Sequence, residues 1–163
     1  MYWIQILING LLVGGIYALI AVGFSLVWGV MNIINLTHGG FIMLGSYITM
    51  TLFENWGLDP FLSLPISFMI TFILGYLTQM GIMNRIVKAP IFMTLILTFG
   101  INLLMTNIAT LIWTANFRTV NPSYAKSTFA LGTLQFPTVK VIVFFVAFFL
   151  NFVLGMVLDK TSL

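Results

Sequence analysis

The side chains that could do chemistry are few, and the most unusual group lies at residues 32–40. Asn32, Asn35, Thr37 and His38, the only histidine, interrupt a long apolar run and are followed by two glycines. In hydrocarbon an unsatisfied polar group is costly, so such side chains need a purpose. They could line a translocation path, or His38 could titrate in a proton relay. Alternatively Asn35 or Thr37 caps a helix that begins here, and this structural role is the favoured interpretation.

A second polar pattern recurs at every fourth position, at Thr94, Thr98, Asn102, Thr106 and Thr110. On a helix this spacing forms one slowly turning stripe. Hydrogen bonding to neighbouring helices is the commoner explanation of such a stripe, and a face on a water-filled path is the alternative. Neutral hydroxyls and amides suit a zwitterionic or uncharged solute better than an ion. The candidates for lining a path are therefore Asn32, Asn35, His38, Thr98 and Asn102.

The sequence offers no support for catalysis, a cofactor or a metal site. It holds no cysteine, no GxxxxGK[ST] phosphate loop and no cluster of metal ligands, and His38 has no acid nearby. No carboxylate falls within the apolar runs, which argues against proton coupling. If transport is driven by ATP, another subunit must hydrolyse it. The six Lys and Arg residues are scattered, so no patch for nucleic acid is predicted.

The composition predicts an integral membrane protein. Of 163 residues, 61% are hydrophobic and 6% are charged, whereas a soluble chain carries roughly 25% charged residues to solvate its surface. Every charge falls at the edge of a long uncharged run or between two of them, as the cost of charge in hydrocarbon requires. The predicted fold class is all-α, a polytopic bundle of transmembrane helices.

The elements that position the polar groups follow from the length of the apolar runs. Residues 1–53 contain no Asp, Glu, Lys or Arg, and one helix of that length would approach ~80 Å, far more than the ~30 Å of a hydrocarbon core. The chain must therefore fold back at the polar segment 32–40. A second helix beginning inside this segment is favoured over a re-entrant half-helix.

Residues 1–163 therefore form a single transmembrane domain of about five spans, four of them long and one short. The predicted spans are residues 4–30, 38–53, 61–83, 91–113 and 141–158, with an extramembrane segment at 114–140. Basic residues divide evenly between the two sides, so charge alone does not orient the chain. The acidic loop with Glu54 and Asp59, and the loop lengths, favour a cytoplasmic position for the short connection with Arg85 and Lys88.

Small residues recur at every fourth position of the first span, at Gly10, Gly14 and Ala18. In lipid, helices associate by close packing, and small residues let their backbones approach. The stripe predicts that this span packs closely against another helix.

Two stretches resemble a known family. The first is N-G-x-x-x-G-x-x-Y-A-L-x-A-x-G, which begins at Asn9, and the second combines N-x-x-H-G from Asn35 with M-x-G-S-Y from Met43. Together they resemble the LivH-type permease of branched-chain amino acid ABC importers. The stretch from Arg85 to Pro90 and the one from Leu97 to Ile101 look like a looser version of the next loop and span. The resemblance is strong to about residue 113 and weak beyond it.

The resemblance implies a subunit in a bacterial or archaeal inner membrane that works with several partners. These are a second permease subunit, two ATPase subunits and an extracytoplasmic substrate-binding protein. The lipid bilayer surrounds the membrane-spanning helices. The family topology puts the Arg85/Lys88 loop and the C-terminal end in the cytoplasm. Related members carry urea or short amides, so the solute stays open among these classes.

Two departures from the family pattern matter. Gly40 stands where the family often has an acidic residue, so a role that rests on that charge is absent here. Family permeases also run to nearly twice this length, and Lys160–Leu163 resembles the entry to the loop that docks onto the ATPase. We therefore expect an incomplete permease that does not couple ATP hydrolysis by itself. The alternatives are a secondary transporter and a non-transporting assembly or remnant protein.

Overall fold

The computed structural model describes residues 2–86, 89–116, 118–131 and 134–161. Lys88 of the predicted basic connection and residues 162–163 at the predicted docking-loop entry lie outside this described part. The structure confirms the all-α class, because the described elements are helices apart from two strands of four residues each. Its elements are α1 Tyr2–Met31, α2 Thr37–Trp56, α3 Pro60–Thr78, the π-helical segment η1 Gln79–Met83, α4 Asn84–Ile86, α5 Ile91–Trp113, β1 Thr128–Leu131, β2 Leu134–Pro137 and α6 Thr138–Thr161.

Four helical stretches in the described part are long and apolar enough to cross a membrane: Trp3–Met31, Pro60–Ile86, Ile91–Trp113 and Thr138–Met156. They correspond to the four long predicted spans and make the chain a multi-pass membrane protein. Helix α2 is not among them because its sequence is more polar. With 20 residues it nevertheless reaches ~30 Å, about the thickness of a hydrocarbon core.

Local sequence signals explain where several helices begin and end. Gly57 ends α2 in the left-handed conformation, with φ 64°, which a residue without Cβ adopts at no steric cost. The carboxylate of Asp59 then accepts a hydrogen bond from the backbone N–H of Phe61 at 2.9 Å and caps α3. Pro60 occupies the first turn of α3, where its missing N–H costs nothing.

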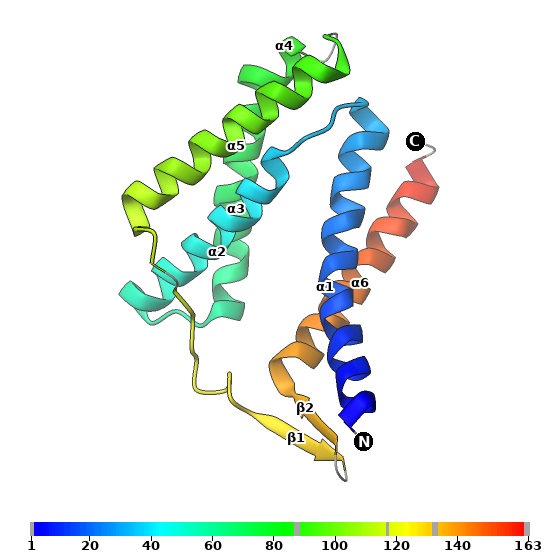
Figure 1. Cartoon of the computed structure of the whole chain (residues 1–163), viewed down its shortest axis with the longest axis vertical. Coiled ribbons are helices and arrows are strands. Elements are labelled where there is room, and N and C mark those ends of the chain that lie inside the picture. The colour runs from blue at the N-terminus through cyan, green and yellow to red at the C-terminus, as the bar shows by residue number, and fades with distance from the viewer. Residues whose placement is uncertain (1, 87–88, 117, 132–133, 162–163) are drawn as a thin grey trace. The chain divides into compact units, whose positions relative to one another are not determined.

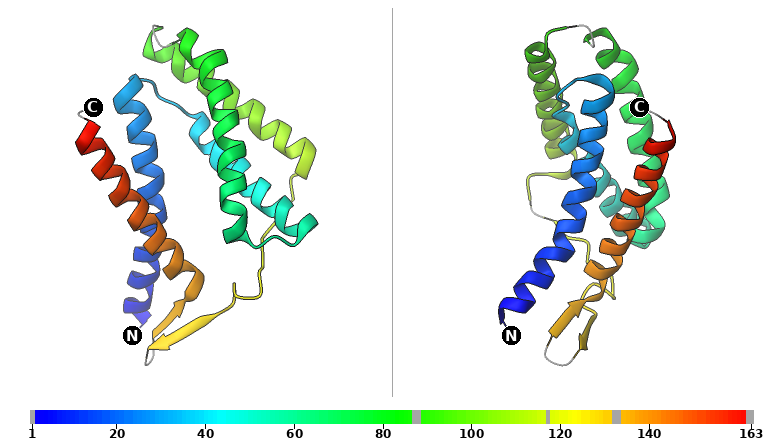
Figure 2. Two further views of the ribbon diagram at one scale, coloured as in Figure 1. Left: turned by 180° about the vertical axis from the view of Figure 1, so that it is seen from behind. Right: turned by 90° about the vertical axis from the view of Figure 1, so that its right-hand side faces the viewer.

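The chain divides into two compact units. The first consists of the described residues of Met1–Leu26 and Asn121–Leu163, and in it α1 and α6 run side by side with the β-hairpin at the end where α1 begins (Figures 1 and 2). The side-chain amide of Gln5 donates to the Gln135 carbonyl at 2.6 Å and accepts from the Gln135 N–H at 3.0 Å. The hairpin is thereby tied to the start of α1.

The hairpin was not predicted within the extramembrane segment 114–140. Its antiparallel register pairs Phe129 with Phe136, and their rings stack with centroids 5.2 Å apart. Alternation of large apolar residues on both sides of Gly132 was the available signal for a hairpin.

The second unit, Val27–Val120, is organised around α2. This helix packs against both α3 and α5 (Figure 1). The most polar of the long helices is therefore the central one of its unit. Residues 32–35, between α1 and α2, are not helical, so an irregular segment leads into the central helix. This arrangement decides where the polar side chains lie.

Candidate functional site

The irregular segment is fixed to the start of α2 by its own side chains. The Oδ1 atom of Asn35 accepts a hydrogen bond from the backbone N–H of Thr37 at 3.1 Å and another from the Thr37 hydroxyl. Thr37 is fully buried. Asn35 thus satisfies a donor that the first turn of a helix leaves without an intrahelical partner. These contacts are those of the structural role considered for Asn35 and Thr37.

Helix α5 holds the same segment from the other side. The Thr98 hydroxyl donates to the Ile34 carbonyl at 2.9 Å, and Thr98 has no exposed surface. Thr98 follows Ile91, the first residue of α5, by seven positions, which places the contact ~10 Å along the helix axis. Non-helical backbone at such depth persists in a membrane only where protein buries it or where it lines a water-filled cavity.

One turn further along, α2 and α5 approach each other at a glycine. A Cβ atom on Gly40 would lie 2.7 Å from Oδ1 of Asn102 and 3.3 Å from Sδ of Met105. Gly40 is itself buried. Oδ1 of Asn102 is buried with no hydrogen-bond partner among the described residues. The amide of Asn102 therefore occupies the space that a side chain at position 40 would fill.

Three of the five predicted path residues, Asn35, Thr98 and Asn102, meet around the beginning of α2. His38 lies in the first turn of α2 and is half-buried. Asn32 is exposed and has a left-handed backbone, with φ 51°. A role in lining a path stays a prediction for all five residues.

The polar stripe on α5 divides into two halves. Thr94 and Thr98 are buried, and Thr98 reaches the irregular segment. Thr106 and Thr110 are exposed, and their hydroxyls donate to carbonyls four residues earlier on the same helix, both at 2.9 Å. Thr98 and Asn102 therefore lie against the segment at the start of the central helix, whereas the hydroxyls of Thr106 and Thr110 bond within α5.

A polar contact between α2 and α3 was missed by the sequence analysis. The hydroxyls of Thr49 and Ser67 are 2.9 Å apart, and Ser63 and Ser67 are buried on α3. Serines four residues apart in an apolar helix were the available signal. A pair of hydroxyl groups thus joins α2 to α3.

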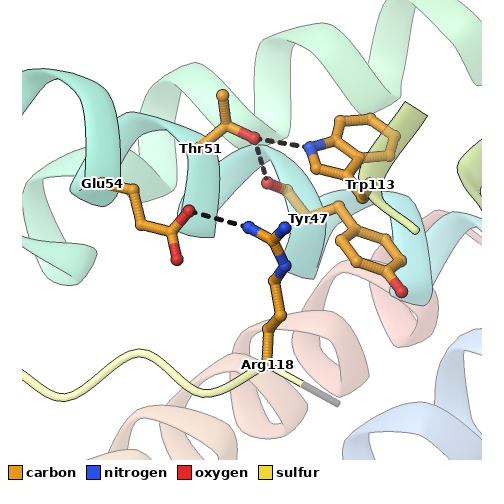
Figure 3. Close-up of polar contacts among 5 residues, drawn as sticks. All are labelled: Tyr47, Thr51, Glu54, Trp113 and Arg118. Carbon is orange, nitrogen blue, oxygen red and sulfur yellow. Dashed lines mark hydrogen bonds and ion pairs between the residues drawn. The ribbon is translucent and has the colours of Figure 1, made fainter. Parts of the chain in front are cut away.

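At its far end, α2 is joined to the end of α5 (Figure 3). The indole N–H of Trp113 donates to the Thr51 hydroxyl at 2.8 Å, while the Thr51 hydroxyl donates to the Tyr47 carbonyl at 2.8 Å. The rings of Tyr47 and Trp113 stack with centroids 4.9 Å apart. Together with the Gly40–Asn102 approach, these contacts show that α2 and α5 run in the same direction.

Arg118, in the chain that follows α5, contacts this end of α2. Nη1 of Arg118 lies 3.2 Å from Oε2 of Glu54, and the two side chains are 38% and 45% exposed. An ion pair so open to water contributes about 0–1 kcal/mol. Beside it lies a cavity of about 560 Å³, whose lining includes Met43, Ser46, Tyr47, Met50, Asn116 and Arg118.

In the first unit the close approach on α1 occurs at Gly15. A Cβ atom there would lie 2.5 Å from Cδ2 of Phe144 on α6, whereas no described atom lies within 4 Å of one on Gly10 or Gly14. Gly14, Gly15 and Ala18 also line a groove beside Phe144. Close packing at Gly10, Gly14 and Ala18 stays a prediction.

Comparison with known proteins adds a family match and several relatives. Residues 6–163 match the family model described as "Branched-chain amino acid transport system / permease component". The high-affinity branched-chain amino acid transport system permease protein BraD of Pseudomonas aeruginosa is 29% identical over 178 residues, which cover 99% of this chain and 57% of BraD.

Two other relatives match over shorter stretches. The probable branched-chain amino acid transport permease protein LivH of Methanocaldococcus jannaschii is 29% identical over 105 residues, 64% of this chain and 33% of that protein. LivH of Escherichia coli K12 is 43% identical over 49 residues, 30% of this chain and 16% of that protein. This chain therefore spans little more than half the length of the curated relatives that it matches, and no solved structure matches it significantly.

Proposed function

Because this chain belongs to the branched-chain amino acid transport system permease family, we propose that it forms part of the translocation path of an ABC importer for branched-chain or related amino acids. The observation that carries this proposal is the irregular backbone of residues 32–35. Thr98 binds it at a point ~10 Å along α5 from the first residue of that helix. In a membrane protein, non-helical backbone at this depth is tolerated where protein buries it or where it lines a water-filled cavity, and the proposal takes it to border the substrate path.

The side chains gathered there suit the proposed solute. Asn35, Thr98 and Asn102 are neutral. Thr98 has no exposed surface and holds the backbone, so the amides of Asn35 and Asn102 are the groups proposed to face the solute. Hydroxyl and amide groups can exchange hydrogen bonds with a zwitterion without trapping it by a net charge. A path lined in this way favours passage over tight binding.

We place the protein in a bacterial or archaeal inner membrane with five crossings, α2 being the short one. The connection at Arg85 is cytoplasmic, and the ends of α2 and α5 at Thr51 and Trp113 are extracytoplasmic. This orientation agrees with the family topology. The proposed partners are a second permease, ATPase subunits that supply the energy, and a substrate-binding protein on the extracytoplasmic side.

Affinity purification tests the importer assignment. The tagged chain is isolated from its native membrane in mild detergent, and the proteins bound to it are identified by mass spectrometry. An ABC-type ATPase and a second permease are the expected partners, present in comparable amounts to the chain. Purification without any ATPase, while the chain itself is folded and abundant, would instead favour a remnant protein.

A further inference from the structure

The cavity between the end of α2 and the chain after α5 combines three kinds of surface. Met43 and Met50 supply flexible apolar side chains, and Met50 is 4% exposed. Ser46 and Asn116 supply neutral polar groups, and Arg118 supplies a positive charge. At about 560 Å³ the cavity falls within the range of sites for small ligands.

Arg118, which lines the cavity, and its ion-pair partner Glu54 are open to a ligand. Nη1 of Arg118 contacts one carboxylate oxygen of Glu54, and a guanidinium carries five N–H donors. Donors therefore remain for a second carboxylate, which arginine binds in a bidentate manner. Glu54, in turn, can accept from a cationic donor of the same ligand. Both side chains are more than a third exposed, so a ligand reaches them without unfolding the helices.

The cavity has rigid walls on one side. Tyr47, which lines it, stacks on Trp113, and Trp113 is bound to Thr51 on α2 (Figure 3). A stacked and hydrogen-bonded ring pair holds its position better than an isolated side chain. The apolar part of a ligand would therefore meet a preformed surface of Tyr47, Met43 and Met50.

We propose that this cavity binds a free α-amino acid with an apolar side chain, in its zwitterionic form. The carboxylate binds Arg118, the ammonium group binds Glu54, and the side chain lies against Met43 and Met50. The inference rests on the proposed function and deepens it, because it gives the extracytoplasmic end of the path an entry site. Neither charge was named as a candidate residue from the sequence.

Binding of tritiated L-leucine to the purified chain in phosphatidylcholine nanodiscs tests the inference. Saturable binding is expected, and unlabelled leucine or valine should compete for it. Leucinamide lacks the carboxylate and 4-methylpentanoate lacks the ammonium group, so each should compete at least about tenfold more weakly. Equal competition by either analogue, or the absence of saturable binding, overturns the proposal. This arm needs no variant and is independent of any folding defect.

Variants locate the site. Arg118→Gln and Glu54→Gln should each weaken leucine binding about tenfold or more. Arg85→Gln is the control: Arg85 is an exposed arginine that does not line the cavity, so this variant should leave leucine binding unchanged. Unchanged binding in Arg118→Gln places the ligand elsewhere and overturns the assignment. Loss of binding when phosphatidylethanolamine is added to the nanodisc identifies a lipid headgroup as the occupant and also overturns it. A chain that co-purifies with an ATPase but does not bind leucine refutes only the cavity site.

Discussion

At the scale of single residues, the polar side chains within apolar runs are the ones that the sequence singles out. Asn35, Thr98 and Asn102 stand out in the sequence, and the structure brings them together around the start of α2. The groups that these side chains contact could not be predicted, because a glycine or a backbone carbonyl does not indicate in the sequence which side chain will lie against it. Gly40 and the Ile34 carbonyl become recognisable only when α2 lies against α5. The same limit applies to Arg118, whose partner Glu54 is distant in sequence.

Gly40→Ala should destabilise the protein. The new Cβ would lie 2.7 Å from Oδ1 of Asn102, and displacement of packed groups costs about 1–3 kcal/mol. Gly39→Ala is the matched control, because Gly39 is on the same helix and no described atom lies within 4 Å of a Cβ there. Thermal unfolding in detergent should show a lower midpoint for Gly40→Ala only. Equal midpoints in the two variants would contradict the close approach of α2 to α5.

At the scale of elements, the central observation is that the most polar long helix packs between two others. The sequence favoured a helix that begins inside the polar segment, and α2 begins at Thr37. It could not show which helices surround α2, since packing partners depend on contacts between distant residues. The β-hairpin was missed for a related reason. Its strands of four residues each are too short to stand out from a polar loop.

Thr98→Val should loosen the irregular segment. Valine preserves the shape of threonine but leaves the Ile34 carbonyl without its donor, and a lost hydrogen bond of this kind in a membrane protein costs about 0.6–2 kcal/mol. Thr106→Val is the control, since the Thr106 hydroxyl bonds only within α5. Unfolding in a detergent titration reports the difference. A loss of stability that is as large in Thr106→Val would mean that Thr98 does not hold the segment.

At the scale of the whole molecule, composition alone was sufficient for the fold class. So little charge leaves lipid as the solvent for the outer surface of the helices. Orientation was not decided in this way, because the basic residues are evenly divided. The two compact units were also not predicted, since the division at residues 26 and 27 falls inside an unbroken apolar helix.

Cysteine labelling maps the orientation without background, because the chain contains no cysteine. Single cysteines at Ile4, Asn55, Ser123 and Arg85 are treated with a membrane-impermeant maleimide on intact cells. We expect positions 4, 55 and 123 to react, and position 85 to react only after permeabilisation. If α2 were re-entrant, position 4 would lie on the side opposite position 55. The pattern of these two positions therefore decides whether α2 crosses the bilayer.

Uptake of labelled leucine by proteoliposomes tests most directly whether the chain is part of an ATP-driven importer. The complex that co-purifies with the tagged chain is reconstituted, with its binding protein on one side and ATP on the other. We expect leucine accumulation that requires ATP and the binding protein and is lost with a non-hydrolysable ATP analogue. Accumulation driven by an ion gradient in the absence of ATP would contradict the proposed function and identify a secondary transporter instead.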